Sequence, residues 1–185
     1  MFKAVVIGVS AGGLTALNRL FSCLKKDFSA PIIVVQHLHP TQNQSYIDVI
    51  GKDGPLPVIE AIDKCIFHAG AIYFAPPDYH LFIEKGDVFS LSVDEKINHC
   101  RPSIDALFES AADVLGSQVI GVILTGANND GAEGLRKIKN NGGLTIVEDP
   151  ATAESPYMPQ AAIDCVKVDC VLGIDDIAKK LNQLC

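Results

Sequence analysis

The stretch AVVIGVSAGGLTALNRL, residues 4–20, decides the fold of this chain. Its first six residues are small or β-branched and apolar, which is typical of a strand buried on both faces of a sheet. Glycines 8, 12 and 13 interrupt the apolar run, and leucines then return at helical spacing. The stretch therefore predicts a strand, a tight glycine turn that carries Ser10, and a helix that begins near Gly13.

The same alternation of strand and helix continues along the chain. Apolar and β-branched runs predict strands at residues 3–9, 32–36, 72–76, 80–84, 87–92, 119–126, 144–148 and 166–169. Helical spacing predicts helices at residues 13–26, 41–52, 103–116, 130–143 and 173–184. Strands separated by helices of this length favour an α/β fold, a doubly wound and mainly parallel sheet with helices on both faces. One antiparallel hairpin, turning at Lys85-Gly86, interrupts the pattern.

Composition excludes several classes of protein. The chain has 185 residues, enough for one sizeable core, so residues 1–185 are expected to form a single domain. Fifteen basic and 22 acidic residues give a formal net charge of −7 without a basic cluster, which argues against nucleic acid as a partner. The apolar runs are too short to insert into a membrane, and no signal peptide precedes the first strand, so a cytoplasmic location is expected. Six cysteines without C-x-x-C or metal-finger spacing predict reduced structural thiols and no metal.

Three chemically useful side chains follow predicted strands. Ser10 follows the first strand, His37 follows the second, and Asp130 follows the strand at 119–126 after a short loop. The carboxyl ends of parallel strands share one edge of the sheet, where such folds place their sites. A serine hydroxyl becomes a nucleophile when an imidazole takes its proton, and a carboxylate orients the imidazole. The sequence therefore predicts a catalytic group of Ser10, His37 and Asp130, with backbone amides at the start of the first helix available for an oxyanion.

Each residue taken alone has a simpler explanation. Ser10 suits the cap of the helix that follows it, His37 suits a packed or solvent-facing histidine, and Asp130 suits the cap of its own following helix. His39 is a second candidate for the base, ahead of the three other histidines at 68, 80 and 99. The conjunction of nucleophile, base and acid at one edge favours the catalytic interpretation.

Two other classes of site share the glycine-rich turn. A dinucleotide loop, G-x-G-x-x-G, needs glycine at the position of Ser10 and an acidic residue after the second strand, where this chain has Gln36 and His37. An α/β-hydrolase places its acid before its histidine, whereas here His37 precedes Asp130. Both departures count against these classes, although a nucleotide-binding protein stays as an alternative.

Six stretches spread along the chain carry a resemblance to a known family. They are IGVSAGG (7–13), QHLHP (36–40), GAIYFAPPDYHL (70–81), CRPSIDALFESAA (100–112), LTGANNDGAEGL (124–135) and PYMPQAAI (156–163). Together they resemble the catalytic domain of CheB-type chemotaxis protein-glutamate methylesterases. The resemblance implies a triad of Ser10, His37 and Asp130, oxyanion donors at the amides of Ala11 and Ala127, and no cofactor. It implies hydrolysis of glutamate γ-methyl esters, with glutamine deamidation as a related activity, on the cytoplasmic domain of methylated chemoreceptors.

The chain departs from the family pattern at two loops and in its architecture. Ala11 replaces a threonine, and Ala127-Asn128-Asn129 replaces a stretch that contains methionine, so the substrate pocket is expected to differ. No receiver domain is expected in these 185 residues, so either a response regulator or methyltransferase acts in trans, or the chain is a fragment of a longer protein. A catalytically idle module that docks on a receptor or methyltransferase is the main alternative to an enzyme.

Overall fold

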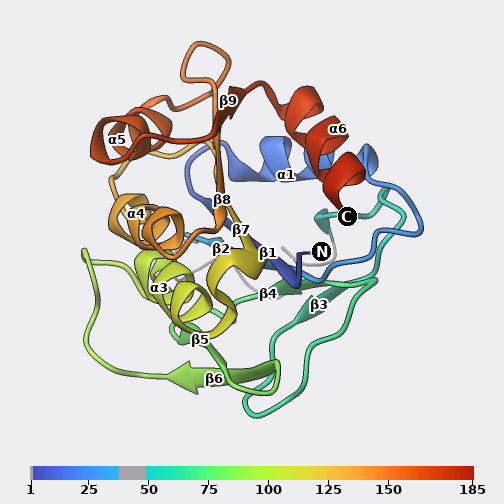
Figure 1. Ribbon diagram of the computed structural model, residues 1–185, viewed down its shortest axis with the longest axis vertical. Helices are drawn as coiled ribbons and strands as arrows, with labels where there is room; N and C mark the ends of the chain where they lie inside the picture. The colour runs from blue at the N-terminus through green and yellow to red at the C-terminus, as the bar shows by residue number, and fades with distance from the viewer. Residues whose placement is uncertain (1, 38–48) are drawn as a thin grey trace.

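A computed structural model describes residues 2–37 and 49–185 of the chain. His39 and most of the helix predicted over residues 41–52 lie outside the described residues. Figure 1 shows a central sheet with helices on both of its faces. Within the described ranges, no helix is long and apolar enough to cross a membrane.

The central sheet has seven strands, and every neighbouring pair is parallel. The strands are β1 (Ala4–Val9), β2 (Ile32–Gln36), β3 (Val58–Glu60), β4 (Ile72–Phe74), β7 (Val119–Ile123), β8 (Leu144–Glu148) and β9 (Cys170–Leu172). Their order in space is β3-β4-β2-β1-β7-β8-β9, so the next three strands of this sheet along the chain lie on one side of β1 and the last three lie on the other. This is the doubly wound sheet that the sequence predicts, with β1 at the point where the winding reverses.

Two apolar cores cover the two faces of the sheet. Helices α1 (Gly13–Ser22) and α6 (Ile174–Leu184) pack on the face that carries Val5, Ile7 and Val9 of β1. The opposite face is covered by helices α3 (Ile104–Leu115), α4 (Ala132–Asn140) and α5 (Tyr157–Cys165), and by the antiparallel hairpin of β5 (His80–Glu84) and β6 (Val88–Ser92). Residues alternate between the two cores along β1, which is why this strand is apolar throughout.

Three local predictions differ from the structure. The hairpin turn has three residues, Lys85 to Asp87, because Glu84 pairs with Val88. Strand β3 was not predicted, since it is only three residues long and lies at the edge of the sheet. The last strand is β9 rather than residues 166–169, because the carboxylate of Asp169 accepts hydrogen bonds from both the backbone and the hydroxyl of Thr145.

Gly8 of β1 lets the amino end of α3 approach the sheet closely. A Cβ atom at this position would lie 2.3 Å from Cγ2 of Ile104, the first residue of α3. We expect Gly8→Ala to lower the free energy of unfolding by about 1–3 kcal/mol, because the core must shift to admit the methyl group. The measurement is the urea midpoint at constant m-value. Gly173→Ala is the control, since its Cβ would have no atom closer than 3.9 Å; an equal loss in both variants would contradict the prediction.

Candidate active site

The candidate site lies at the carboxyl ends of β1, β2 and β7, where the winding of the sheet reverses. The backbone N–H of His37 donates to the carbonyl of Val9 at 3.1 Å, and that of Ser10 donates to the carbonyl of Thr125 at 2.9 Å. Ser10, the first residue after β1, therefore lies between the segments that follow β2 and β7. In doubly wound folds this position is the usual place for a binding crevice.

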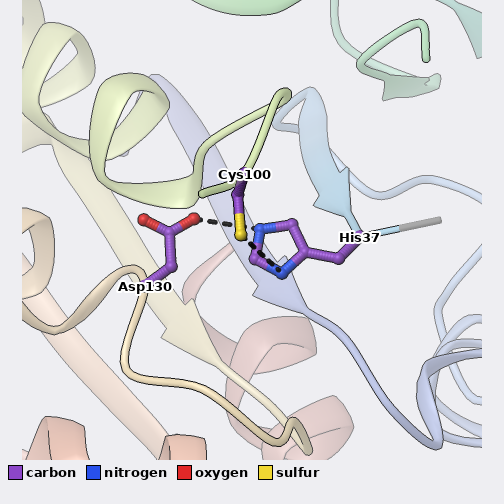
Figure 2. A group of neighbouring side chains, drawn as sticks. All are labelled: His37, Cys100 and Asp130. Atoms are coloured by element: carbon purple, nitrogen blue, oxygen red, sulfur yellow. Dashed lines mark hydrogen bonds and ion pairs between the residues drawn. The ribbon is translucent and has the colours of Figure 1, made fainter. Parts of the chain in front are cut away.

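His37 and Asp130 form a direct pair in this crevice. Nε2 of His37 lies 2.9 Å from Oδ2 of Asp130, although the two residues are 93 positions apart in the chain (Figure 2). The Asp130 side chain is fully buried, and the His37 side chain is 12% exposed. The structure thus brings together two of the three residues that the sequence predicts for the site.

Asp130 is held by the amino end of a helix other than its own. Its carboxylate accepts hydrogen bonds from the hydroxyl of Ser103 at 2.9 Å and from the backbone N–H of Ile104 at 2.7 Å. Helix α4 is capped by Gly131 without a side-chain contact, so the simple explanation of Asp130 as the cap of α4 is wrong. Burial opposes ionisation of Asp130, but His37 and the donors on α3 outweigh it and lower the pKa of the carboxyl group. Asp130 is therefore an anion that can orient an imidazole.

The second ring nitrogen of His37 faces Asn128 and Cys100. Its Nδ1 lies 3.2 Å from the amide nitrogen of Asn128 and 3.8 Å from Sγ of Cys100. Burial lowers the pKa of His37, but the hydrogen bonds to Asp130 and Cys100 more than offset it and raise the pKa to about 9. When neutral His37 donates Nε2–H to Asp130, the lone pair that can accept a proton is on Nδ1.

Ser10 follows β1, the strand next to the one that His37 follows. Ser10 and His37 follow the paired residues Val9 and Gln36, and paired residues of parallel strands project to the same face. Among the described residues, no hydrogen bond joins the Ser10 hydroxyl to the imidazole. The N-cap of α1 is Gly12, without a side-chain hydrogen bond, so Ser10 is not the helix cap.

The loops that contain Ala11 and Ala127, the two predicted oxyanion donors, are joined by hydrogen bonds of Thr125. The Thr125 hydroxyl donates to the carbonyl of Ala11 at 2.8 Å and accepts from the backbone N–H of Ser155 at 2.8 Å. Ala11 and Ala127 are exposed. No hydrogen bond formed between described residues uses the backbone N–H of either alanine. Both amides are therefore free, within that part of the chain, to donate to a ligand.

Sequence reasoning missed several residues that surround the pair. Cys100 was interpreted as a structural thiol, and Asn128 was noted only as a departure from the family pattern. His80 is not a base but a support, because it is buried and accepts the backbone N–H of Ser103 at 3.2 Å. No local pattern in the sequence marks these contacts; the only signal was that the segments 100–112 and 124–135 belong to the resembling stretches.

A cleft beside His37 gives access to the pair. Its lining combines the apolar residues Ala75, Pro77 and Pro102 with the basic or titratable residues Lys96, His99 and Arg101. The Arg101 guanidinium donates to the backbone carbonyls of Val93 and Asp94 at 2.8 and 3.0 Å. Arg101 thus fixes the backbone that leads to Lys96. Cys100 also lines the cleft, so the thiol and the imidazole can both be reached by a small solute.

The chain is similar to known proteins over nearly its whole length. A family model described as CheB methylesterase matches residues 5–181. A relative from Leptospira interrogans, to which protein-glutamate methylesterase/protein-glutamine glutaminase activity is provisionally assigned, is 47% identical over 183 residues, which are 99% of this chain and 95% of the relative. The Thermotoga maritima protein-glutamate methylesterase/protein-glutamine glutaminase is 40% identical over 185 residues, and the match covers 98% of this chain but 54% of that protein.

A solved structure agrees over the whole chain. The crystal structure of the Thermotoga maritima CheB methylesterase catalytic domain superposes with a TM-score of 0.94 at 38% identity, covering 100% of both chains. The family model and the relatives each span far more than half of this chain. This chain belongs to the CheB methylesterase family.

Proposed function

We propose that this chain hydrolyses glutamate γ-methyl esters of proteins, with Ser10 as nucleophile, His37 as base and then acid, and Asp130 as the group that orients His37. The observation that supports the proposal most directly is the 2.9 Å His37–Asp130 pair beside the turn that carries Ser10. The pairing of the preceding residues, Val9 of β1 and Gln36 of β2, also supports the proposal, because Ser10 and His37 are the next residues on these neighbouring strands.

The chemistry follows from these positions. The Ser10 oxygen attacks the ester carbonyl while His37 takes the hydroxyl proton, and Asp130 stabilises the imidazolium that forms. The amides of Ala11 and Ala127 would donate to the oxyanion. His37 then protonates the methoxide as it leaves, so that methanol and an acyl-serine result. Water, deprotonated by His37, hydrolyses the acyl-serine and restores Ser10 and a free glutamate.

The proposed substrate is a methylated chemoreceptor. The family acts on chemoreceptors, which implies a protein substrate, and the relatives' names add a protein-glutamine glutaminase activity. We propose the cytoplasmic part of a receptor as the target and residues 1–185 as one catalytic domain. A response regulator or methyltransferase is the proposed partner in trans.

Methanol release from a methylated receptor is the decisive experiment. Purified chain is mixed with receptor that carries labelled methyl esters, and volatile label is counted. Stoichiometric labelling of Ser10 by a fluorophosphonate probe would support an activated serine independently of the substrate. If methanol is not released and Ser10 is not labelled, the result would favour the catalytically idle docking module instead.

The pKa of His37 sets the expected pH dependence. A base must be unprotonated, and below its pKa the unprotonated fraction rises tenfold for each pH unit. Because the pKa of His37 is raised to about 9, kcat/KM should rise steadily from pH 6 and level off near that value. A profile measured with a small ester substrate avoids titration of the receptor. A plateau already reached at pH 7 would contradict the prediction.

A further inference from the structure

Cys100, which the proposed reaction does not use, completes a cluster of three metal-binding groups with His37 and Asp130. His37, Cys100 and Asp130 each offer one ligand atom, and the three atoms lie within 4.8 Å of one another (Figure 2). They come from three separate segments: the end of β2, the loop before α3 and the loop after β7. In the described part of the chain, this is the one group of three such side chains with that spacing.

The donor set suits a thiophilic divalent cation. Imidazole nitrogen, thiolate sulfur and carboxylate oxygen are the three ligand types of Zn²⁺ in proteins. Bond lengths of about 2.0–2.3 Å in a tetrahedral site correspond to ligand spacings of about 3.3–3.6 Å. The distance between Nε2 of His37 and Oδ2 of Asp130, 2.9 Å, would increase slightly. The thiol of Cys100, whose Sγ lies 3.8 Å from Nδ1, would turn toward Nε2 to share the ion.

The surroundings allow an ion to enter and be held. Cys100 and His37 line the open cleft, whereas Asp130 is fully buried behind them. The bonds from Ser103, Ile104 and Asn98 already fix the orientation of the Asp130 carboxylate, as is usual around a metal ligand. A thiolate and a carboxylate together balance the charge of one divalent ion.

We propose that His37, Cys100 and Asp130 form a binding site for a thiophilic divalent cation such as Zn²⁺, and that the bound ion inhibits the enzyme. The ion would bind Nε2 of His37 in place of its proton, which would move to Nδ1, and it would displace the thiol proton of Cys100 to solvent. With the ion on Nε2 and the proton on Nδ1, His37 could no longer take the proton of Ser10. The inhibitory half of the inference rests on the proposed function, but the binding half does not.

Cobalt(II) titration of the untagged, reduced chain tests the binding half. One equivalent of Co²⁺ should produce a thiolate-to-metal charge-transfer band in the near ultraviolet, and Zn²⁺ should bleach it. Cys100→Ala and His37→Gln should each lose the band while keeping the circular dichroism spectrum of the folded chain. Cys165→Ser is the matched control and should keep the band, because Cys165 also lies beside a carboxylate, Glu133 at 3.5 Å, but belongs to no such cluster.

The outcomes separate the two halves of the inference. No band in the wild-type chain, or a band that persists in Cys100→Ala, would overturn the site. A band that depends on Cys100, together with methanol release that one equivalent of Zn²⁺ abolishes and a chelator restores, would support both halves. If Zn²⁺ binds but the rate is unchanged, inhibition is overturned. If the metal-free chain releases no methanol while the band develops, the proposed function has failed and the site stands.

Discussion

Ser10→Ala is expected to lower the rate of methanol release by about 10³-fold or more. The substitution removes the oxygen that we propose as the nucleophile, while the turn keeps its backbone bond to Thr125. Residual activity would come from water attacking directly in a site that still stabilises the oxyanion. The rate is measured with labelled receptor at saturating concentration, and the fluorophosphonate probe should no longer react.

The control for this variant is Ser22→Ala. Ser22 is the last residue of α1, the helix that follows the Ser10 turn. Its exposed hydroxyl group donates to the backbone carbonyl of Arg19. This change should leave methanol release and probe labelling as they are in the wild-type chain. Near-normal turnover of Ser10→Ala, with a folded spectrum, would remove Ser10 from the mechanism and with it the proposed reaction.

Asp130→Asn is expected to lower turnover by about 10⁴-fold. The amide NH₂ group can donate to Nε2 of His37 and so favour the wrong tautomer, and the neutral amide no longer stabilises an imidazolium. At least three donors converge on the carboxylate: Nε2 of His37, the Ser103 hydroxyl and the Ile104 amide. An amide nitrogen placed among them leaves a donor unpaired, so we also expect a loss of about 1–3 kcal/mol in the free energy of unfolding. Rates and urea midpoints of the purified variant measure the two effects.

The pH profile distinguishes a catalytic effect of Asp130→Asn from a structural one. In the wild-type chain the carboxylate of Asp130 is a main cause of the raised pKa of His37, against the lowering effect of burial. Without the charge of Asp130, burial lowers the pKa of His37 with less opposition. The residual activity should therefore level off at a lower pH than in the wild-type chain. An unchanged profile, or turnover within tenfold of wild type, would contradict the assigned role of Asp130.

Asp105→Asn is the matched control. Asp105 is a buried carboxyl group whose pKa is raised by burial and by the neighbouring charge of Asp130. It accepts the backbone N–H of Gly134 at 2.7 Å and makes no hydrogen bond with His37 among the described residues. The amide resembles the protonated carboxyl group, so this variant should lose far less activity than Asp130→Asn and keep the alkaline pH profile.

Local pattern predicted most of the fold. The strand, glycine turn and helix of residues 4–20 appear as β1 and α1, because apolar spacing and glycine positions are properties of a continuous segment. The segments 58–60 and 170–172 were missed or misplaced, because three residues are too few to show a period. Their pairing depends on neighbours that are distant in the sequence.

The sequence by itself determined which residues lie at the carboxyl ends of the strands, where the candidate active site is. Ser10 and His37 follow β1 and β2, and Asp130 follows β7 after a short loop, since parallel strands end at one edge. Only the tertiary structure decided what each of them contacts. The amino end of α3 holds Asp130, and Cys100 and Asn128 meet Nδ1 of His37 from segments 63 and 91 positions away. The packing of α3 against Gly8 brings the donors Ser103 and Ile104 to Asp130, and no periodicity along the chain encodes any of these contacts.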